Sequence, residues 1–127
     1  MMVQRYQDLE VYKLAFQLQQ DVFRLTKSFS KEETFSLTDQ IRRASRSIGA
    51  NIAEAWRKRR YAAHFVSKLT DSDGENAETQ HWLATACDCG YLDKNVYTVL
   101  QRRSDEIGAK LGAMIRNPEI WKPKERT

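Results

Sequence analysis

Proline and glycine are scarce in this chain of 127 residues, which contains only 2 Pro and 5 Gly. Both prolines lie after position 117. Because these two residues interrupt regular secondary structure, a chain with so few of them before its C-terminal end favours long helices over many short strands. The length suits one domain that can bury a hydrophobic core without staples.

Cysteines and long apolar runs are also few. The 2 cysteines, Cys87 and Cys89, lie too close together for a disulfide framework and indicate reduced thiols. No stretch approaches the ~20 apolar residues that are needed to cross a membrane. Residues 1–7 lack the apolar core of a signal peptide. The sequence therefore predicts a cytoplasmic protein without a membrane partner.

Motifs that carry catalysis or hold cofactors are missing from the sequence. It has no Gly-rich phosphate loop, no Ser or Cys in a nucleophile motif, and only 2 His for acid–base chemistry. Glu78 and His81 have the Glu-x-x-His spacing of a di-iron bundle, but that site needs a second such pair, and His64 has Tyr61 where the glutamate should be. We therefore predict no enzyme activity, no cofactor and no metal site.

Four amphipathic stretches, separated by short polar breaks, are the main feature that is present. They predict helices at about residues 8–29, 35–60, 61–89 and 93–116. Helices of this length with short connections predict an all-α protein, an antiparallel up-down-up-down four-helix bundle over residues 1–117. Residues 118–127 are expected to form an extended C-terminal tail.

Local signals mark the ends of these helices. Ser30 and Glu33 fit a capping box, and Asp93 is a candidate N-cap for the last helix. Gly90 is typical of a helix stop. Residues 71–74 form the weakest helical segment of the chain, because they combine two aspartates, a serine and a glycine.

The first predicted helix is apolar over an arc wider than one bundle seam requires. One stripe contains Leu9, Tyr12, Phe16 and Phe23, and a second contains Val11, Leu14, Leu18, Leu25 and Phe29. Two interpretations stay open. The helix is either well buried in a small core, or part of the arc lies in a subunit interface.

Polar residues interrupt the core line of the third helix at Ser72, Asn76 and Thr79. Asn51 and Glu54 flank the apolar seam of the second helix. We hypothesise that these residues form a buried polar layer that fixes helix register, as single buried polar residues do in coiled coils. Glu54 would also pair with a lysine at i+4, Lys58.

The strongest feature outside the expected core is basic, in a chain of net charge +4 and pI about 9.2. Four arginines fall within about 60° of one another on the second helix at 3.6 residues per turn. They are Arg42, Arg46, Arg57 and Arg60. The last two enclose a basic run, Arg57-Lys58-Arg59-Arg60, at the helix end.

Three interpretations of this basic stripe stay open. It is a solvated face with charges favourable at a helix C-terminus, a phosphate-binding surface, or one side of ion pairs between subunits, for which the acidic residues of the third helix are candidate partners. We expect nucleic-acid binding by Arg46, Arg57, Lys58, Arg59 and Arg60. Structural or assembly roles are expected for Arg42, Asn51, Glu54, Glu75 and Glu78. The competing outcome is that Arg42 and Arg46 pair with acidic residues such as Glu75 and Glu78, within or between subunits.

The second helix also carries a family resemblance. It includes Gln40-Ile41-Arg42-Arg43-Ala44, Ser47-Ile48 and Asn51-Ile52-Ala53-Glu54. These segments resemble the signature of the four-helix-bundle proteins called 23S rRNA-intervening-sequence proteins. Residues 6–12 resemble that family's opening and residues 90–92 its turn into the last helix, so the resemblance covers roughly residues 6–115.

The resemblance implies a bundle without enzyme activity that assembles as a ring-like homopentamer. A relative of the family, the accessory variability determinant protein of diversity-generating retroelements, is a basic pentamer that partners a reverse transcriptase and nucleic acid. The function of that relative extends to this chain only by analogy. Two functions stay open. The protein is an accessory module that binds RNA or DNA, or a scaffold that binds another protein and no nucleic acid.

Overall fold

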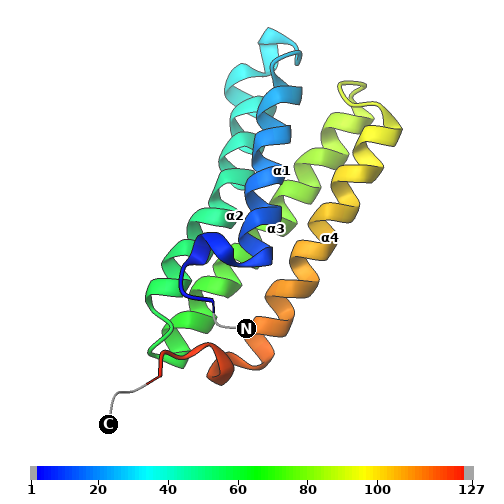
Figure 1. The fold of residues 1–127 in the computed structure, drawn as a ribbon. Helices are drawn as coiled ribbons and strands as arrows, with labels where there is room; N and C mark the ends of the chain where they lie inside the picture. Colours follow the sequence, from blue (N-terminus) through cyan, green and yellow to red (C-terminus); the bar gives the residue numbers. More distant parts are fainter. Residues whose placement is uncertain (1–2, 125–127) are drawn as a thin grey trace.

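The computed structural model describes residues 3–124, and within this range every regular element is a helix. Its four α-helices are α1 (Glu10–Thr26), α2 (Asp39–Arg57), α3 (Ala62–Asp88) and α4 (Lys94–Arg116). They lie side by side, and the chain turns back at each connection (Figure 1). The predicted all-α class with four helices is confirmed. None of the helices in the described part of the chain is both long and apolar enough to span a membrane.

The first two α-helices begin later than the sequence predicts. The chain enters α1 through the short 3-10 helix η1 (Tyr6–Asp8) and the extended, buried Leu9. It enters α2 through the 3-10 helix η2 (Lys31–Glu33) and the π-helix η3 (Thr34–Thr38). Apolar residues in these turns keep the spacing of the helix that follows, so apolar periodicity alone does not separate the turns from the α-helices.

The predicted capping box at Ser30 is wrong. The Ser30 side chain makes no capping bond to η2. The Glu33 carboxylate instead accepts hydrogen bonds from the hydroxyls of Ser36 (2.7 Å) and Tyr91 (3.0 Å). These two bonds hold the pKa of Glu33 below its ordinary value. Glu33 thus ties the α1–α2 connection to the α3–α4 connection, a contact between segments far apart in sequence.

α3 is one continuous helix of 27 residues, although residues 71–74 have weak helical propensity. It stops where the sequence predicts, at Gly90, whose φ of +83° suits glycine. The backbone N–H of Gly90 donates to the carbonyl of Cys87 (3.0 Å) and that of Tyr91 to the carbonyl of Ala86 (2.9 Å). This pair of bonds is the Schellman ending of a helix.

The start of α4 also follows its local signal. The Asp93 carboxylate accepts hydrogen bonds from the backbone N–H groups of Asn95 (2.6 Å) and Val96 (3.4 Å). These bonds satisfy donors that the first turn of a helix otherwise leaves free. The prediction of an N-cap at Asp93 is confirmed.

The segment after α4 folds back on the bundle. Residues Pro118–Trp121 form the 3-10 helix η4, and the Trp121 ring packs edge-on against Trp56, with 6.1 Å between centroids. The expected extended tail is therefore wrong for these residues, because apolar contact with the end of the bundle holds them. Residues 125–127 of the expected tail lie outside the described residues.

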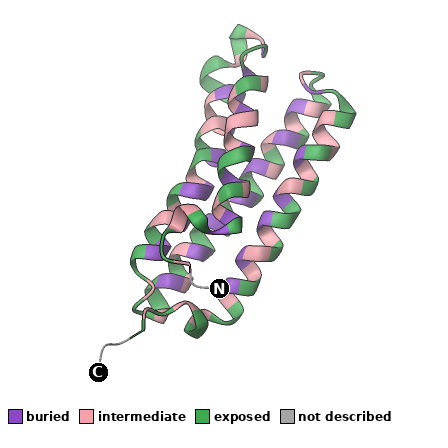
Figure 2. Ribbon diagram, viewed as in Figure 1, coloured by how far each residue is buried: buried purple, intermediate pink, exposed green. Residues whose placement is uncertain are grey.

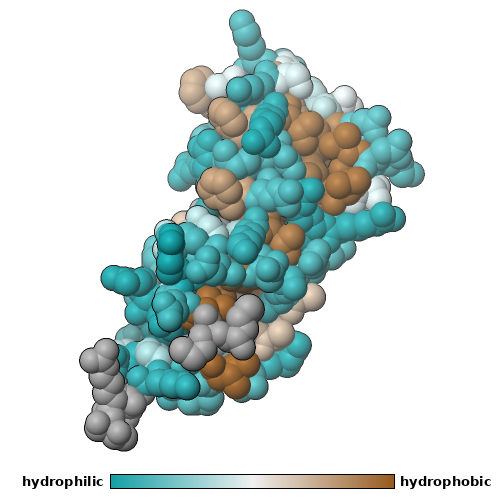
Figure 3. Space-filling model, in the orientation of Figure 1, coloured by the Kyte–Doolittle hydropathy of each residue, from teal (hydrophilic) through white to brown (hydrophobic). Residues whose placement is uncertain are grey.

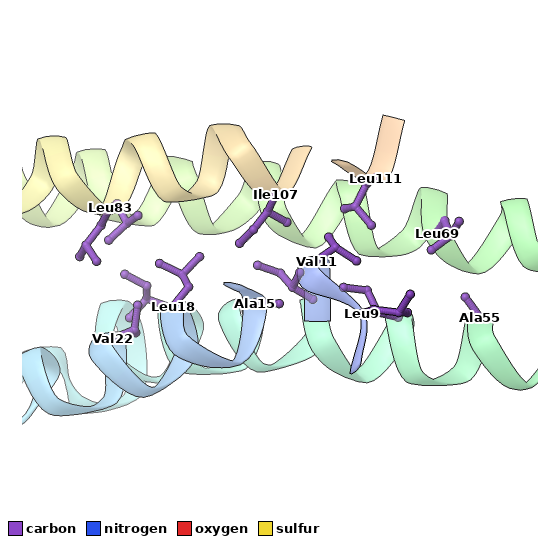
Figure 4. Packing of buried hydrophobic residues seen from close by; sticks show 14 of the residues in the cluster. Leu9, Val11, Ala15, Leu18, Val22, Ala55, Leu69, Leu83, Ile107 and Leu111 are labelled. Atoms are coloured by element: carbon purple, nitrogen blue, oxygen red, sulfur yellow. The ribbon is translucent and has the colours of Figure 1, made fainter. Parts of the chain in front are cut away.

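The hydrophobic core runs the length of the four helices on their facing sides (Figure 2). Figure 4 shows Leu18 of α1 and Leu83 of α3 pointing into the shared interior, with Ile107 of α4 further along. All three are at most 1% exposed. Burying each such side chain stabilises the fold by about 1.5–3 kcal/mol, so this seam fixes which helix faces point inward.

A buried polar layer crosses the middle of the core, as predicted for α3. Ser72, Asn76 and Thr79 are at most 3% exposed. Ser72 Oγ donates to the carbonyl of Ile48 on α2 (2.8 Å). Asn76 Nδ2 donates to the carbonyl of Ser104 on α4 (2.9 Å), and Ser104 Oγ donates to Asn76 Oδ1 (2.7 Å). The layer joins α3 to both neighbours by directional bonds.

The two α2 residues assigned to this layer are not part of it. Asn51 is half-buried and donates to the Ser47 carbonyl of its own helix (2.9 Å). Glu54 is exposed, and its partner is Lys68 of α3 (3.0 Å), not Lys58. The hypothesis is wrong for Asn51 and Glu54, because the rotation of α2 points both side chains away from the interior.

Candidate nucleic-acid interface

The basic run at the end of α2 forms a tight turn at one end of the bundle. We call Arg57, Lys58, Arg59 and Arg60 the basic turn. α2 ends at Arg57, the backbone N–H of Tyr61 donates to the Lys58 carbonyl (3.1 Å), and α3 begins one residue later. Arg60 therefore lies outside the helix, and its predicted place on a helical stripe with the other arginines is wrong.

Arg59 is held by the fold. Its guanidinium lies 4.0 Å from the centroid of the Trp56 ring, and its Nη1 donates to the Trp56 carbonyl (2.8 Å). Burial lowers the pKa of Arg59, and the positive charges of Arg57 and Arg60 lower it further. Arg59 thus lies close to two other cations, and its contacts with the buried Trp56 anchor the basic turn to the bundle.

The other three cations of the basic turn are exposed. None of the ion pairs formed within residues 3–124 involves Arg57, Lys58 or Arg60. Like charges held together in this way repel one another, and an anion between them relieves the repulsion. The basic turn therefore concentrates exposed positive charge at one end of the bundle.

The N-terminal half of the predicted stripe has a different role. Arg42 is half-buried, and its Nε donates to Thr26 Oγ1 on α1 (2.8 Å). The guanidinium groups of Arg42 and Arg46 lie 5.0 and 5.6 Å from the centroid of the Phe23 ring. Arg42 is thus a link between α1 and α2. Arg46 is exposed, but lies roughly 16 Å along the helix from Arg57 at 1.5 Å per residue.

The acidic residues of α3 do not neutralise these arginines. Glu75 is half-buried, and burial raises its pKa, with the charges of Glu78 and Asp71 adding to the effect. Glu78 accepts a hydrogen bond from the Trp82 indole (3.3 Å). The alternative that Arg42 pairs with Glu75 or Glu78 of its own subunit is wrong, because Arg42 turns toward α1.

A cross-helix ion pair does join α2 to α3, through a different lysine. Lys68 Nζ lies 3.0 Å from Glu54 and 3.6 Å from Asp71. The hydrogen bond and charge of Lys68 hold the pKa of Glu54 below its ordinary value, and the same bond raises the pKa of Lys68. Glu54 therefore links α2 to α3 through a partner that sequence spacing did not identify.

The sequence reasoning missed the aromatic and basic groups beside the basic turn. Tyr61 follows it directly and is 61% exposed, with the His64 ring 5.7 Å away. On the other side, Arg5 and Gln7 from the N-terminal segment line a shallow hollow that includes Arg57. Tyr61 adjoins the basic run in sequence, and that adjacency was the available signal.

A second surface lies between α1 and α4, where apolar side chains gather between the upper parts of the two helices (Figure 3). The groove is lined by Leu25, Val96, Val99 and Leu100, and its rim includes Asp21, Arg24, Asn95 and Arg103. Val99 in this groove is 53% exposed. Phe16 on α1 is 46% exposed and lies outside the groove, beside Tyr12. The wide apolar arc of the first helix thus extends beyond the core of its own bundle.

Groups that could support metal or acid–base chemistry are dispersed. No cluster of three or more His, Cys, Asp or Glu side chains suited to a metal ion occurs in residues 3–124. Cys87 is half-buried and Cys89 exposed, and both are free thiols. The described residues instead bring positive charge together at the basic turn, which the aromatic Tyr61 directly follows in the chain.

The chain is similar to a known protein family and to a solved structure. Residues 7–113 match the family described as 23S rRNA-intervening sequence protein. The chain is similar to a solved structure from Bacteroides thetaiotaomicron, a protein with unknown function from the S23 ribosomal protein family. The two are 30% identical with a TM-score of 0.76, over 84% of this chain and 96% of that one. No protein with a curated description matches the chain.

Proposed function

The chain belongs to the 23S rRNA-intervening sequence protein family, and on that premise we propose that it is a non-enzymatic, oligomeric accessory module that binds nucleic-acid phosphates through its basic turn. We place this role in the cytoplasm, where the two free thiols would stay reduced. The family description names no ligand for the bundle, so the proposal depends on the site.

One observation carries the proposal: three exposed cations meet on one hydrogen-bonded turn, and none of them forms an ion pair within residues 3–124. Some basic residues elsewhere, such as Lys68 and Arg103, are paired with carboxylates, and those without an ion pair do not form a run of consecutive cations. Free cations gain most from a polyanion, because each phosphate contact releases condensed counterions. Phosphate contacts carry no sequence information, so binding should be indifferent to base sequence.

The test is a titration of labelled, mixed-sequence oligonucleotides with the Arg57→Glu, Arg60→Glu double variant at two salt concentrations. The wild-type chain should bind and weaken steeply as salt rises. The double variant should bind at least tenfold more weakly at low salt. Its salt slope should be shallower by about 1–2, since each lost phosphate contact removes about 0.7–0.9 from the slope.

A matched control separates the basic turn from the overall charge. Lys94 and Arg102 on α4 are exposed and make no ion pair within residues 3–124. The Lys94→Glu, Arg102→Glu double variant changes the net charge by the same amount, and should keep most of the affinity. Equal losses in the two double variants, or an unchanged affinity for the Arg57→Glu, Arg60→Glu variant, would contradict the proposal.

We further propose that the antiparallel bundle assembles as a ring-like homopentamer through the α1–α4 face. The support is the exposed apolar surface of Val99 and the apolar groove around it, together with the family membership. A ring would repeat the basic turn once per subunit, and further contacts with one strand would then be effectively intramolecular. Light scattering should give a mass near five times 14.8 kDa.

Val99→Asp tests which face carries the contact, because a charge in an apolar interface is costly to bury. This variant should shift the mass toward that of the monomer, whereas Ser67→Asp, at an exposed position on α3, should not. A wild-type chain that is monomeric at micromolar concentration would refute the assembly.

A protein–protein scaffold without a nucleic-acid role is the second candidate. The apolar α1–α4 groove favours it, since such a surface also suits a partner helix. The two candidates differ in the oligonucleotide titration. A wild-type chain that binds no RNA or DNA at low salt would leave the scaffold as the function of this bundle.

A further inference from the structure

We infer that the nucleic acid bound by the basic turn is single-stranded, and that Tyr61 is the platform on which one of its bases stacks. This inference rests on the proposed phosphate-binding function and adds the class of ligand. Its basis is an exposed aromatic residue that directly follows, in the chain, cations that form no ion pair within residues 3–124.

Tyr61 is held in place by its backbone while its ring remains in solvent. Its N–H donates to the Lys58 carbonyl (3.1 Å), and its carbonyl accepts from the N–H of Phe65 (3.0 Å). Phe65 is fully buried, so the second bond ties Tyr61 to the core. A ring that is 61% exposed on a rigid backbone is already oriented for a ligand and loses little conformational entropy on binding.

The surroundings of the ring leave it accessible. Its aromatic neighbour in the described structure, His64, lies 5.7 Å away at an interplanar angle of 52°, so the two rings do not stack face to face. His64 is itself exposed. Trp56, by contrast, is buried and covered by Arg59, so Tyr61 supplies the free aromatic surface at this turn.

The combination of charge and ring selects the form of the nucleic acid. Cations alone attract the phosphates of duplexes and single strands alike. A ring gains stacking energy only from a base whose face is free, which a duplex does not offer. Stacking on an aromatic side chain contributes about 1–3 kcal/mol per base and tolerates any base. Because Lys58 and Tyr61 are the ends of one turn, a strand whose phosphate meets the cations brings an adjacent base to the ring.

The experiment titrates the full chain with labelled single-stranded RNA, single-stranded DNA and the corresponding duplexes, all of one length and mixed sequence. Tyr61→Ala should weaken single-strand binding by about fivefold to a hundredfold, which corresponds to the 1–3 kcal/mol of one stacked base. It should leave duplex affinity and the salt slope unchanged, because the cations remain. The two single-stranded arms show whether the sugar matters, and weakening in either one supports the inference.

Two further variants control for structure. Tyr61→Phe keeps the ring and should restore single-strand binding. Phe35→Ala removes an aromatic ring that is 92% exposed in η3, away from the basic turn, and should have no effect. If Tyr61→Ala lowers the melting temperature, Tyr61→Leu keeps the apolar bulk without the aromatic face and should bind as weakly as alanine.

The outcomes separate this inference from the function on which it rests. If the Arg57→Glu, Arg60→Glu variant loses affinity but Tyr61→Ala does not, the stacking platform is refuted while phosphate binding stands. Duplexes that bind the wild-type chain as tightly as single strands do would refute it equally. If no oligonucleotide binds at all, both proposals fail.

Discussion

The pair Asn76–Ser104 is the point at which the buried polar layer can be tested most sharply. Asn76 Nδ2 donates to the Ser104 carbonyl (2.9 Å) and Ser104 Oγ donates to Asn76 Oδ1 (2.7 Å). Ser104 Oγ also accepts from Gln80 Nε2 (2.8 Å). With Ser104 fully buried and Asn76 3% exposed, water cannot replace a partner that is removed.

Asn76→Ala should lower the free energy of unfolding by about 2–4 kcal/mol. Two hydrogen bonds at about 1 kcal/mol each are lost, and the Ser104 hydroxyl is left without its acceptor in the core. Ser104→Ala should cost about 1–3 kcal/mol, since it leaves Asn76 Oδ1 without its donor, although Gln80 keeps a second acceptor in Asp105 at 3.1 Å.

The two losses should not add. In the Asn76→Ala, Ser104→Ala double variant neither group remains to be left unpaired, so its cost should fall short of the sum by about 1–2 kcal/mol. Urea unfolding at one fixed protein concentration measures all four corners of the cycle. Thr70→Ala, at an exposed position on α3, serves as the control. Single costs that add within about 0.5 kcal/mol would refute the reasoning that these groups satisfy each other.

Three further predictions concern the ends and surfaces of α3 and α4. Gly74→Ala should raise the free energy of unfolding by about 0.5–1 kcal/mol in urea unfolding, because a Cβ there meets nothing within 4 Å and alanine is the better helix former. Asp93→Ala should lower it by about 1 kcal/mol in the same assay, through loss of the N-cap of α4. Glu75 has a pKa raised by burial and by the neighbouring acids, so the folded state holds its proton more tightly than the unfolded chain. The free energy of unfolding should therefore fall as the pH rises from the pKa of Glu75 in the unfolded chain to its higher pKa in the folded state. Glu75→Gln should stabilise the protein at pH about 7 but not below about 4, and urea unfolding at both pH values checks this.

Helix number, the end of α3, the start of α4 and the inward faces could be predicted from the sequence because they depend on neighbours a few positions away. Gly90 ends α3 through its own backbone conformation, and Asp93 caps α4 through amides two and three residues on. The burial of Asn76 follows from its place on an apolar line with a helical repeat. The late start of α2 was missed, because the π-helical turn before it has the same apolar pattern.

The candidate site was predictable only as a stretch of basic sequence. Periodicity placed Arg60 on a helix that in fact ends at Arg57, and it could not distinguish the anchored Arg59 from its exposed neighbours. It offered acidic partners for Arg42 as one alternative, whereas within the bundle Arg42 contacts a threonine and a phenylalanine of α1.

By itself, then, the sequence determined an all-α chain of four amphipathic helices with a polar layer in its core and a basic run between the second and third helices. Only the tertiary structure decided which of those cations are free and that Tyr61 stands exposed beside them. The reason is physical. A helical repeat depends on contacts within a turn or two, whereas a side chain's partner depends on how each helix is rotated about its axis and where its neighbours end.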